Sequence, residues 1–331
     1  MFRRLSRSFV VPPAFAAFAA STAFLSGCGG GGSASAPGTG ATRSATTPIY
    51  LTDAPLSGAE SVNVTISKIE ARRVGEGFVD TGLSYSGNLL ELKNAEALLG
   101  EAKLPAGKYT GLRLTLANAT ITINGQTYAL EPVTGLGGGS ASGNGHLPAL
   151  PPNVPSAATG KVAEALARHA ADVTVGADGR SATLLINAPF TVVEDGSAGS
   201  SAPLLLDFNV AHSVVATGNG RYLLKPIIPV VRKDEAGEVA GEVALEPAPA
   251  AGEDEPEVEV AAMASGQTAE AQNATVADGV RKGGKFRIPA LPRGIYDVTV
   301  TAQGYAPVTL PGVMITPGQK PDLGKITLRK P

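Results

Sequence analysis

The sequence predicts an all-β fold in which two antiparallel β-sandwich domains follow each other along the chain. Of the 331 residues, 41 are Gly and 25 are Pro, only 17% are charged and none is Trp. This composition is typical of many short elements joined by turns, rather than of long solvated helices. Alternating apolar and polar residues, repeatedly joined by two-residue turns, point the same way, and the chain is long enough for two cores.

The first 27 residues have the layout of an export signal. A basic start is followed by an apolar stretch over residues 9–25 and then by small residues. The stretch ends in a motif that resembles the bacterial lipobox, formed by Leu25, Ser26, Gly27 and Cys28. The resemblance implies that Cys28 is acylated with fatty acids such as palmitate and becomes the first mature residue. An uncleaved membrane anchor is the alternative, although the apolar stretch is shorter than a typical spanning helix.

The residues after the signal are predicted to form a tether. Residues 28–47 begin with Cys28, the only cysteine, and continue mostly with Gly, Ser, Ala and Thr, which offer too little apolar surface to fold. With a single cysteine, no disulfide can form within the chain. Gly29 stands where inner-membrane retention signals have Asp, so by resemblance to known sorting rules we expect delivery to the outer membrane.

Residues 48–232 are predicted to form the first sandwich. Val62, Val64 and Ile66 alternate with polar residues, as in a strand with one buried face. Three dipeptides that favour tight hairpins follow along the chain: Asn124-Gly125, Asp178-Gly179 and Asn219-Gly220. Short hairpins imply antiparallel pairing, and strands that are solvated on one face pack as two layers.

Two stretches interrupt this β pattern. Residues 94–100 read as one or two helical turns that end at a glycine. The region 133–171 is rich in Gly, Ser and Pro and reads as an insertion, most of it a long loop, with an amphipathic helix over residues 161–170.

A short motif occurs twice, as LPAGKY at 104–109 and LPRGIY at 291–296. In both copies, Pro fixes one backbone angle, Gly supplies an angle that other residues avoid and Tyr begins a strand, so we interpret the motif as a structural turn. The key positions are Gly107, Tyr109, Gly294 and Tyr296. After the first copy, the apolar Leu112 has the opposite parity to Tyr109, which predicts a bulge near Gly111 or a strand buried on both faces.

Two families are recognised from longer motifs. YLTDAP, LLELKNAEALLG, LPAGKYTGLRL and LDFNVAHSVVATGNGRYLLKPIIPVV resemble the bacterial family called domain of unknown function 4382, which is found in secreted lipoproteins. Residues 233–331, with GGKFRIPALPRGIYDVTVTAQGY, resemble the carboxypeptidase regulatory-like domain, a small prealbumin-like sandwich. The first resemblance implies boundaries and cellular context rather than chemistry. The second implies a module that accompanies peptidases and outer-membrane proteins without being catalytic.

Few residues suggest chemistry. The sequence contains no GxSxG elbow, no HExxH and no phosphate-binding glycine loop that leads into a helix. The three histidines, at positions 146, 169 and 212, lack ligand spacing. The remaining candidates are acids expected at strand ends, where they could gather around calcium or a sugar: Asp53, Asp80 and Asp207, of which Asp53 and Asp207 are retained as candidate ligand or metal positions. Acids at strand ends more commonly accept backbone N–H bonds.

Charge and motifs together define the expected function. Removal of the signal, with its three arginines, leaves 24 basic against 29 acidic residues, or −5, which gives no electrostatic basis for binding nucleic acid. We therefore expect a protein without a cofactor or catalytic residues, anchored to a membrane by lipid, whose sandwiches bind an envelope glycan or protein or act as a structural module. The alternatives are an accessory subunit of an envelope complex and a hydrolase with a composite acidic site.

Overall fold

The computed structural model describes residues 43–54, 56, 58–92, 95–134, 169–193, 201–217, 220–265, 271–277 and 279–331. Residues Thr42–Pro331 belong to one compact unit. The export signal, Cys28, His146 and residues 161–168 of the expected helix lie outside the described residues, and Ala170, at the end of that helix, instead forms a β-bridge with Ile227. Among the described residues, none belongs to a helix long and apolar enough to cross a membrane.

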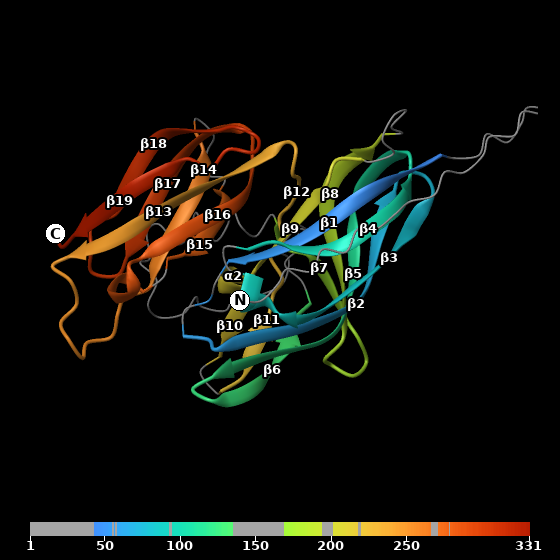
Figure 1. The fold of residues 1–331 in the computed structure, drawn as a ribbon. Coiled ribbons are helices and arrows are strands. Elements are labelled where there is room, and N and C mark those ends of the chain that lie inside the picture. Colours follow the sequence, from blue (N-terminus) through green and yellow to red (C-terminus); the bar gives the residue numbers. More distant parts are fainter. Residues whose placement is uncertain are drawn as a thin grey trace, which may run out of the picture. The chain divides into compact units, whose positions relative to one another are not determined.

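The first sandwich contains two sheets (Figure 1). The smaller has four strands in the order β12-β9-β1-β4. The larger has eight, with the path β10-β11-β6-β5-β2-β3; in addition β8 pairs with β5, and β7 pairs with β8. The strands are β1 (Ser44–Ala54), β2 (Ser61–Arg73), β3 (Gly77–Asn88), β4 (Ala97–Pro105), β5 (Gly107–Ile123), β6 (Gln126–Pro132), β7 (Asp172–Val175), β8 (Ala182–Val192), β9 (Leu204–Asn209), β10 (Val214–Ala216), β11 (Tyr222–Leu224) and β12 (Val230–Arg232). Two short helices accompany them, η1 (Leu89–Leu92) and α2 (Val210–Ser213).

The second sandwich is formed by the C-terminal strands (Figure 1). A three-stranded sheet has the order β16-β13-β19, and a four-stranded sheet has the order β15-β14-β17-β18. The elements are β13 (Ala236–Glu246), β14 (Val258–Ala264), β15 (Ala271–Val276), η3 (Val280–Lys282), β16 (Lys285–Pro292), β17 (Gly294–Ala302), β18 (Val308–Ile315) and β19 (Asp322–Arg329).

Each sandwich has its own core between its two sheets. In the first, Leu51 and Leu206 of the smaller sheet meet Leu112 and Leu114 of the larger. In the second, the core joins residues such as Val243 of the three-stranded sheet and Val298 of the four-stranded one. The predicted all-β fold with two tandem sandwiches is confirmed, and burial of these inward faces is the main favourable contribution to folding.

The sheets are antiparallel-rich but not purely antiparallel. β1 pairs in parallel with β9, β11 with β6, and β13 with β19. A parallel pair cannot be joined by a short hairpin, so its partners come from distant parts of the sequence. For this reason the turn signals that predict the hairpins say nothing about these three pairs.

Local turn chemistry accounts for the hairpins. Asn124 and Gly125 both have positive φ, at 51° and 71°, and join β5 to β6. The turn between β7 and β8 is held by Asp178, whose carboxylate accepts the amides of Arg180 and Ser181 and the Ser181 hydroxyl. These bonds lower the pKa of Asp178 to about 2.

The helical turn expected over residues 94–100 is wrong. The chain is a 3-10 helix at Leu89–Leu92 and then the strand β4, which starts at Ala97 and pairs with β1. Ala, Leu and Glu favour helix locally, but pairing along a neighbouring strand outweighs that preference here.

The bulge expected near Gly111 is present. Between Tyr109 and Gly111, the pairing of β5 with β8 shifts register, so that Tyr109 and Leu112 both face the core. A Cβ atom at Gly111 would lie 1.9 Å from the backbone oxygen of Ile186. The bulge therefore needs a residue without a side chain at this position.

Candidate functional site

The repeated LPxGxY motif forms the same hydrogen bond in both sandwiches. The Tyr109 hydroxyl donates to the carbonyl of Pro105, and the Tyr296 hydroxyl donates to the carbonyl of Pro292, each over 2.7 Å. Both rings are buried, and burial raises the pKa of Tyr296 to about 12. The motif thus holds the turn before a strand by tying the tyrosine to the proline four residues earlier.

The two glycines of the motif have different roles. Gly107 has a φ of +151°, in the region that favours glycine. Gly294 is not among the glycines with positive φ, which corrects the expectation for the second copy. There, a Cβ atom would lie 3.2 Å from the ring of Tyr296, so close approach of the tyrosine accounts for the glycine.

The structure places Asp53 and Asp207 on neighbouring strands but on opposite faces of the smaller sheet. Asp53 pairs with Phe208, whereas Asp207 pairs with Thr52, one residue earlier along β1. Because successive side chains of a strand alternate between faces, Asp53 shares the core-facing side with Phe208 and Asp207 lies on the other side. Both are buried, at 3% and 0% exposure. The structure therefore does not bring these two carboxylates together.

Asp53 and Asn209 together hold the short helix α2. One carboxylate oxygen of Asp53 accepts the amide of Val210 at 3.1 Å, and the Asn209 side-chain oxygen accepts the amide of His212 at 3.3 Å. The first amides of a helix lack partners within the helix, so side-chain acceptors stabilise its start. The third acid, Asp80, lies inside β3 rather than at a strand end, beside Lys68 at 3.3 Å.

A junction joins the face of the smaller sheet that carries Asp207 to the second sandwich. Asn209 donates a buried hydrogen bond of 2.7 Å from its side-chain amide to the carbonyl of Ala274. Ile227 forms a small apolar cluster with Ala261 and Ala274, with Met263 packed against it. Apolar contact and a buried hydrogen bond therefore both connect the sandwiches.

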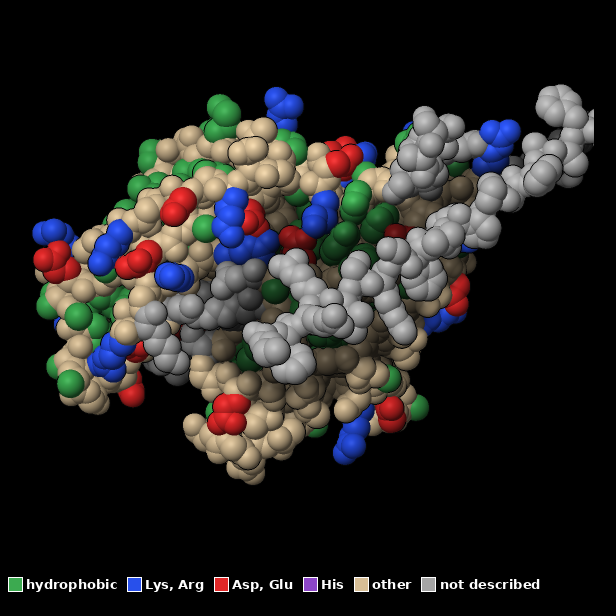
Figure 2. All heavy atoms as spheres, in the orientation of Figure 1, with side chains coloured by type: hydrophobic (Ala, Val, Ile, Leu, Met, Phe, Trp, Pro, Cys, Tyr) green, Lys and Arg blue, Asp and Glu red, His purple; other side chains and the backbone are tan. Residues whose placement is uncertain are grey.

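A chain of alternating charges crosses the same junction. Glu96, just before β4, pairs with Lys233 and with Arg287 of β16, the latter over 3.1 Å. Arg287 also pairs with Glu238, which accepts Lys320 at 2.9 Å. Arg287 has a side chain only 9% exposed, so its two carboxylate partners offset the cost of burying its charge. On the face in Figure 2, the basic and acidic side chains are interspersed in the same way.

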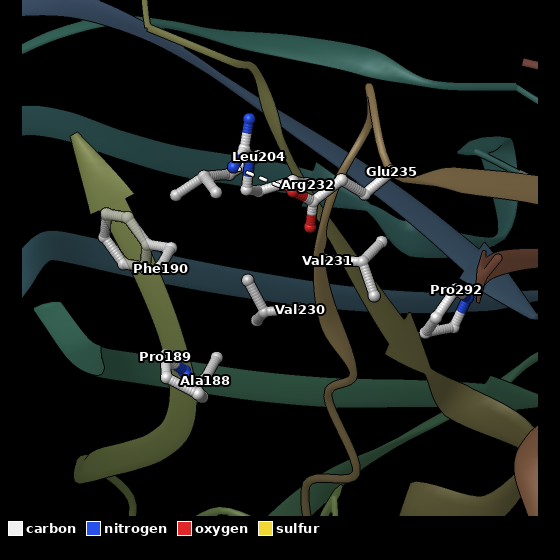
Figure 3. Close-up of a pocket in the computed structure, with 9 residues that line it drawn as sticks. All are labelled: Ala188, Pro189, Phe190, Leu204, Val230, Val231, Arg232, Glu235 and Pro292. Atoms are coloured by element: carbon white, nitrogen blue, oxygen red, sulfur yellow. Dashed lines mark ion pairs between the residues drawn. The ribbon is translucent and has the colours of Figure 1, made fainter. Parts of the chain in front are cut away.

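Two cavities open at the junction. The larger, of about 260 Å³, is lined by Ala290 and by the five charged residues of the ion-pair network just described. Ala290 has a φ of +58°, an unusual angle for a residue other than glycine. The smaller, of about 160 Å³, is shown in Figure 3, where Phe190, Leu204 and Val230 surround a mainly apolar hollow and the Arg232–Glu235 ion pair lies at its edge.

A buried pair of titratable groups faces across the junction. His212 of α2 points its Nε2 atom at Glu259 of β14, 3.8 Å from Oε1, and this nitrogen has no hydrogen-bond partner in the described part of the chain. Burial lowers the pKa of His212 to about 4. Burial, with a smaller contribution from the charge of Glu257, raises the pKa of Glu259 to about 7. Both shifts favour the neutral forms, so we describe a neutral buried pair rather than an ion pair.

The other histidine positions add no ligand set to this pair. His169 lies just before the isolated bridge that joins Ala170 to Ile227. Within the described ranges, no three His, Cys, Asp or Glu side chains are grouped so that they could hold a metal ion.

Sequence reasoning missed the residues of the junction. Across the junction, Glu96 and Arg287 are 191 residues apart and Asn209 and Ala274 are 65 apart, and no local pattern encodes contacts at such separations. Glu259 did carry a signal, because it stands inside the apolar run VEVAAM. Five successive residues of that strand are buried, so a carboxylate among them lies within a covered surface.

Comparison with curated proteins finds no match. The solved structures found include the Bacillus anthracis TIE protein (11% identity, 89% of this chain and 42% of that one, TM-score 0.21). They also include the major pilin subunit BcpA of Bacillus cereus (12%, 86% and 100%, TM-score 0.20) and two B repeat units of the collagen-binding protein of Staphylococcus aureus (14%, 87% and 74%, TM-score 0.22). This chain thus spans less than half of the first of them, and TM-scores this low carry no argument.

Family models match most of the described chain. Residues 249–329 match the carboxypeptidase regulatory-like domain, which comprises β14 to β19. Residues 44–226 match the model described as "Domain of unknown function (DUF4382)", from the first strand to the segment after β11. The DUF4382 match covers more than half of the chain, and it precedes the carboxypeptidase regulatory-like match in the sequence, as the motifs predict. The chain therefore belongs to the DUF4382 family and carries a carboxypeptidase regulatory-like domain after its DUF4382 domain.

Proposed function

We propose that this protein is a non-catalytic, lipid-anchored protein of the bacterial cell envelope, whose two sandwiches act as one structural module that binds an envelope glycan or protein. The observation that carries the proposal is the junction. Asn209 and Arg287, both largely buried, join the sandwiches there, and Asp53 holds the helix beside it. Side chains that could serve chemistry thus have structural partners, and a fixed arrangement of two sandwiches suits the presentation of a binding surface.

The anchor is tested at the N-terminus of the mature protein. Mass spectrometry of the protein purified from membranes should find Cys28 as the first residue, with the added mass of its acyl chains. A Cys28→Ala variant should keep its signal and lose this modification. A wild-type protein with an intact, unmodified leader would overturn this part of the proposal.

The single module is tested by calorimetry. The wild-type mature chain should unfold in one transition if the junction couples the sandwiches. Arg287→Met leaves Glu96 and Glu238 without their shared cation, so the second sandwich should unfold at a lower temperature and separate into its own transition. Arg329→Met is the matched control, because Arg329 is exposed and its ion pair is with Glu246, which is also exposed. Two separate transitions in the wild type would contradict a coupled module.

The binding role is tested with the chain as bait. Immobilised wild-type protein should retain a glycan or a protein from a solubilised envelope fraction, and the heat-denatured protein should not. Turnover of a glycan or peptide library by the purified chain, lost in Asp207→Asn but present in the correctly folded wild type, would overturn the non-catalytic assignment.

A further inference from the structure

At one end of the first sandwich, the start of β1, the β2–β3 turn, the β4–β5 turn and the end of β8 lie together; we call this the proximal end. Arg43 accepts the amide of Ala106 at its carbonyl over 2.8 Å. The Arg73 side chain donates to the Ala106 carbonyl at 2.6 Å, and the amide of Val74 donates to the carbonyl of Lys108 at 2.9 Å. The turn of the first LPxGxY motif therefore lies beside the β2–β3 turn and beside the start of β1.

The end of β8 completes this group. Val192 pairs with Gly107, so Val193, the next residue, lies at the same end. Val193 is 61% exposed and Val74 is 56% exposed, which makes them two of the most exposed large apolar side chains among the described residues. Both stand at tips, where they contribute to neither core.

Three basic side chains lie on the strands that meet at this end. Arg72, Lys103 and Lys108 are exposed, and none of them forms an ion pair with a described residue. The acid of the β2–β3 turn, Glu76, is paired with Arg73. Figure 2 shows blue side chains at the end of the first sandwich where β1 starts.

The described residues of the proximal end carry only a modest excess of positive charge, because the exposed Glu101 lies two residues from Lys103 along β4. So modest an excess of positive charge can attract only a partner that carries many negative charges and comes into contact, because charges separated by more than about 8 Å are largely screened at physiological salt.

We propose that the proximal end rests on the surface of a membrane rich in anionic phospholipids. Arg72, Lys103 and Lys108 meet the lipid phosphates, and Val74 and Val193 enter the head-group region. This inference rests on the proposed anchoring through Cys28. The 15 residues from Cys28 to Thr42 can span at most about 50 Å, so an acylated Cys28 keeps the start of β1 close to the bilayer. Such a tether raises the local concentration of the proximal end at the surface, so even weak contacts are occupied.

The test separates this contact from the acyl anchor. The mature-length chain, residues 28–331, retains every residue that the structure describes, and Cys28→Ser prevents acylation. Its binding is measured by co-sedimentation with vesicles of phosphatidylglycerol and phosphatidylethanolamine, and with vesicles of phosphatidylcholine alone. We expect binding to the anionic vesicles only, weakening as salt rises.

The variants identify the surface. Each basic side chain at an anionic membrane strengthens binding about fivefold, so the triple variant R72Q/K103Q/K108Q should bind at least tenfold more weakly. The matched control K285Q/K325Q/K330Q removes three exposed lysines of the second sandwich and should change binding less than twofold. Equal loss in both triple variants, or binding to the two vesicle types alike, would overturn the inference. Acylation of Cys28 is measured separately by mass spectrometry, so failure of the anchor and failure of this contact give different results.

Discussion

The buried glutamate at the junction offers the most specific test of the electrostatics. Glu259 is 9% exposed, and its pKa rises from the ordinary value of 4.5 to about 7. A carboxyl whose folded-state pKa is raised imposes no cost below the unfolded value of 4.5. As the pH rises from 4.5 through 7, the cost grows because the folded protein must either hold the proton or bury the charge. The full cost is about 3 kcal/mol above pH 7.

The perturbation is Glu259→Gln, which keeps the shape and removes the titration. Gln has its own constant effect on the free energy of unfolding, through the hydrogen bonds of its amide, so the informative quantity is the difference between two pH values. Relative to wild type, the variant should gain about 2 to 3 kcal/mol on going from pH 4.5 to pH 8. Urea denaturation at the two pH values measures this difference, and Glu246→Gln, at an exposed glutamate, is the matched control.

The titration of His212 makes the free energy of unfolding change with pH in the opposite direction, which gives a second measurement on the same pair. Its pKa is lowered to about 4, so its contribution is fully present above the unfolded value of 6.5 and is lost as the pH falls through 4. In the Glu259→Gln variant the opposing contribution of Glu259 is gone, so stability should fall more steeply below pH 6.5 than it does in the wild type. If Glu259→Gln instead destabilises the protein most near pH 6, Glu259 and His212 form a true ion pair and the neutral-pair interpretation is refuted.

Three further results are expected from denaturation and expression experiments. Tyr109→Phe and Tyr296→Phe should each lower the free energy of unfolding by about 1 kcal/mol, because each removes one hydrogen bond to a proline carbonyl, and no change in either would contradict the structural reading of the repeat. Gly111→Ala should abolish folding or cost more than about 3 kcal/mol by thermal melting, whereas Gly125→Asn, at a turn with open space, should be nearly neutral. Arg113→Met should cost about 1 to 3 kcal/mol by urea denaturation, because it leaves a buried carboxylate without its two-bond partner, and an unchanged midpoint would show that solvent replaces that pair.

Much of the fold was predictable because it is encoded in short stretches. Asn124-Gly125 specifies a hairpin through backbone angles that few other residues adopt. The parity conflict between Tyr109 and Leu112 predicted a bulge, because a strand with period two cannot otherwise bury both side chains. In each case the information needed is held within about ten residues.

The junction could not be predicted because its contacts join distant residues. Nothing near Glu96 in the sequence indicates Arg287 as its partner. The strands β1 and β9 pair in parallel and are not joined by a hairpin, so no turn sequence indicates their pairing. The strand at Ala97 was mistaken for helix for the same reason: its partner, β1, outweighs local preference. The candidate acids Asp53 and Asp207 were correctly placed on adjacent strands only by the structure, which also assigns them to opposite faces.

The parallel pair of β1 with β9 has a consequence for how the protein is made. Ile49 lies beside Leu204, so β1 finds that neighbour only after some 150 more residues have been synthesised. Until then β1 exposes an unpaired edge and depends on β4 alone, and closing so long a loop slows folding. Chains cut short before β9 should therefore fold poorly and be cleaved readily by proteases, whereas truncation within the last sandwich leaves this closure intact.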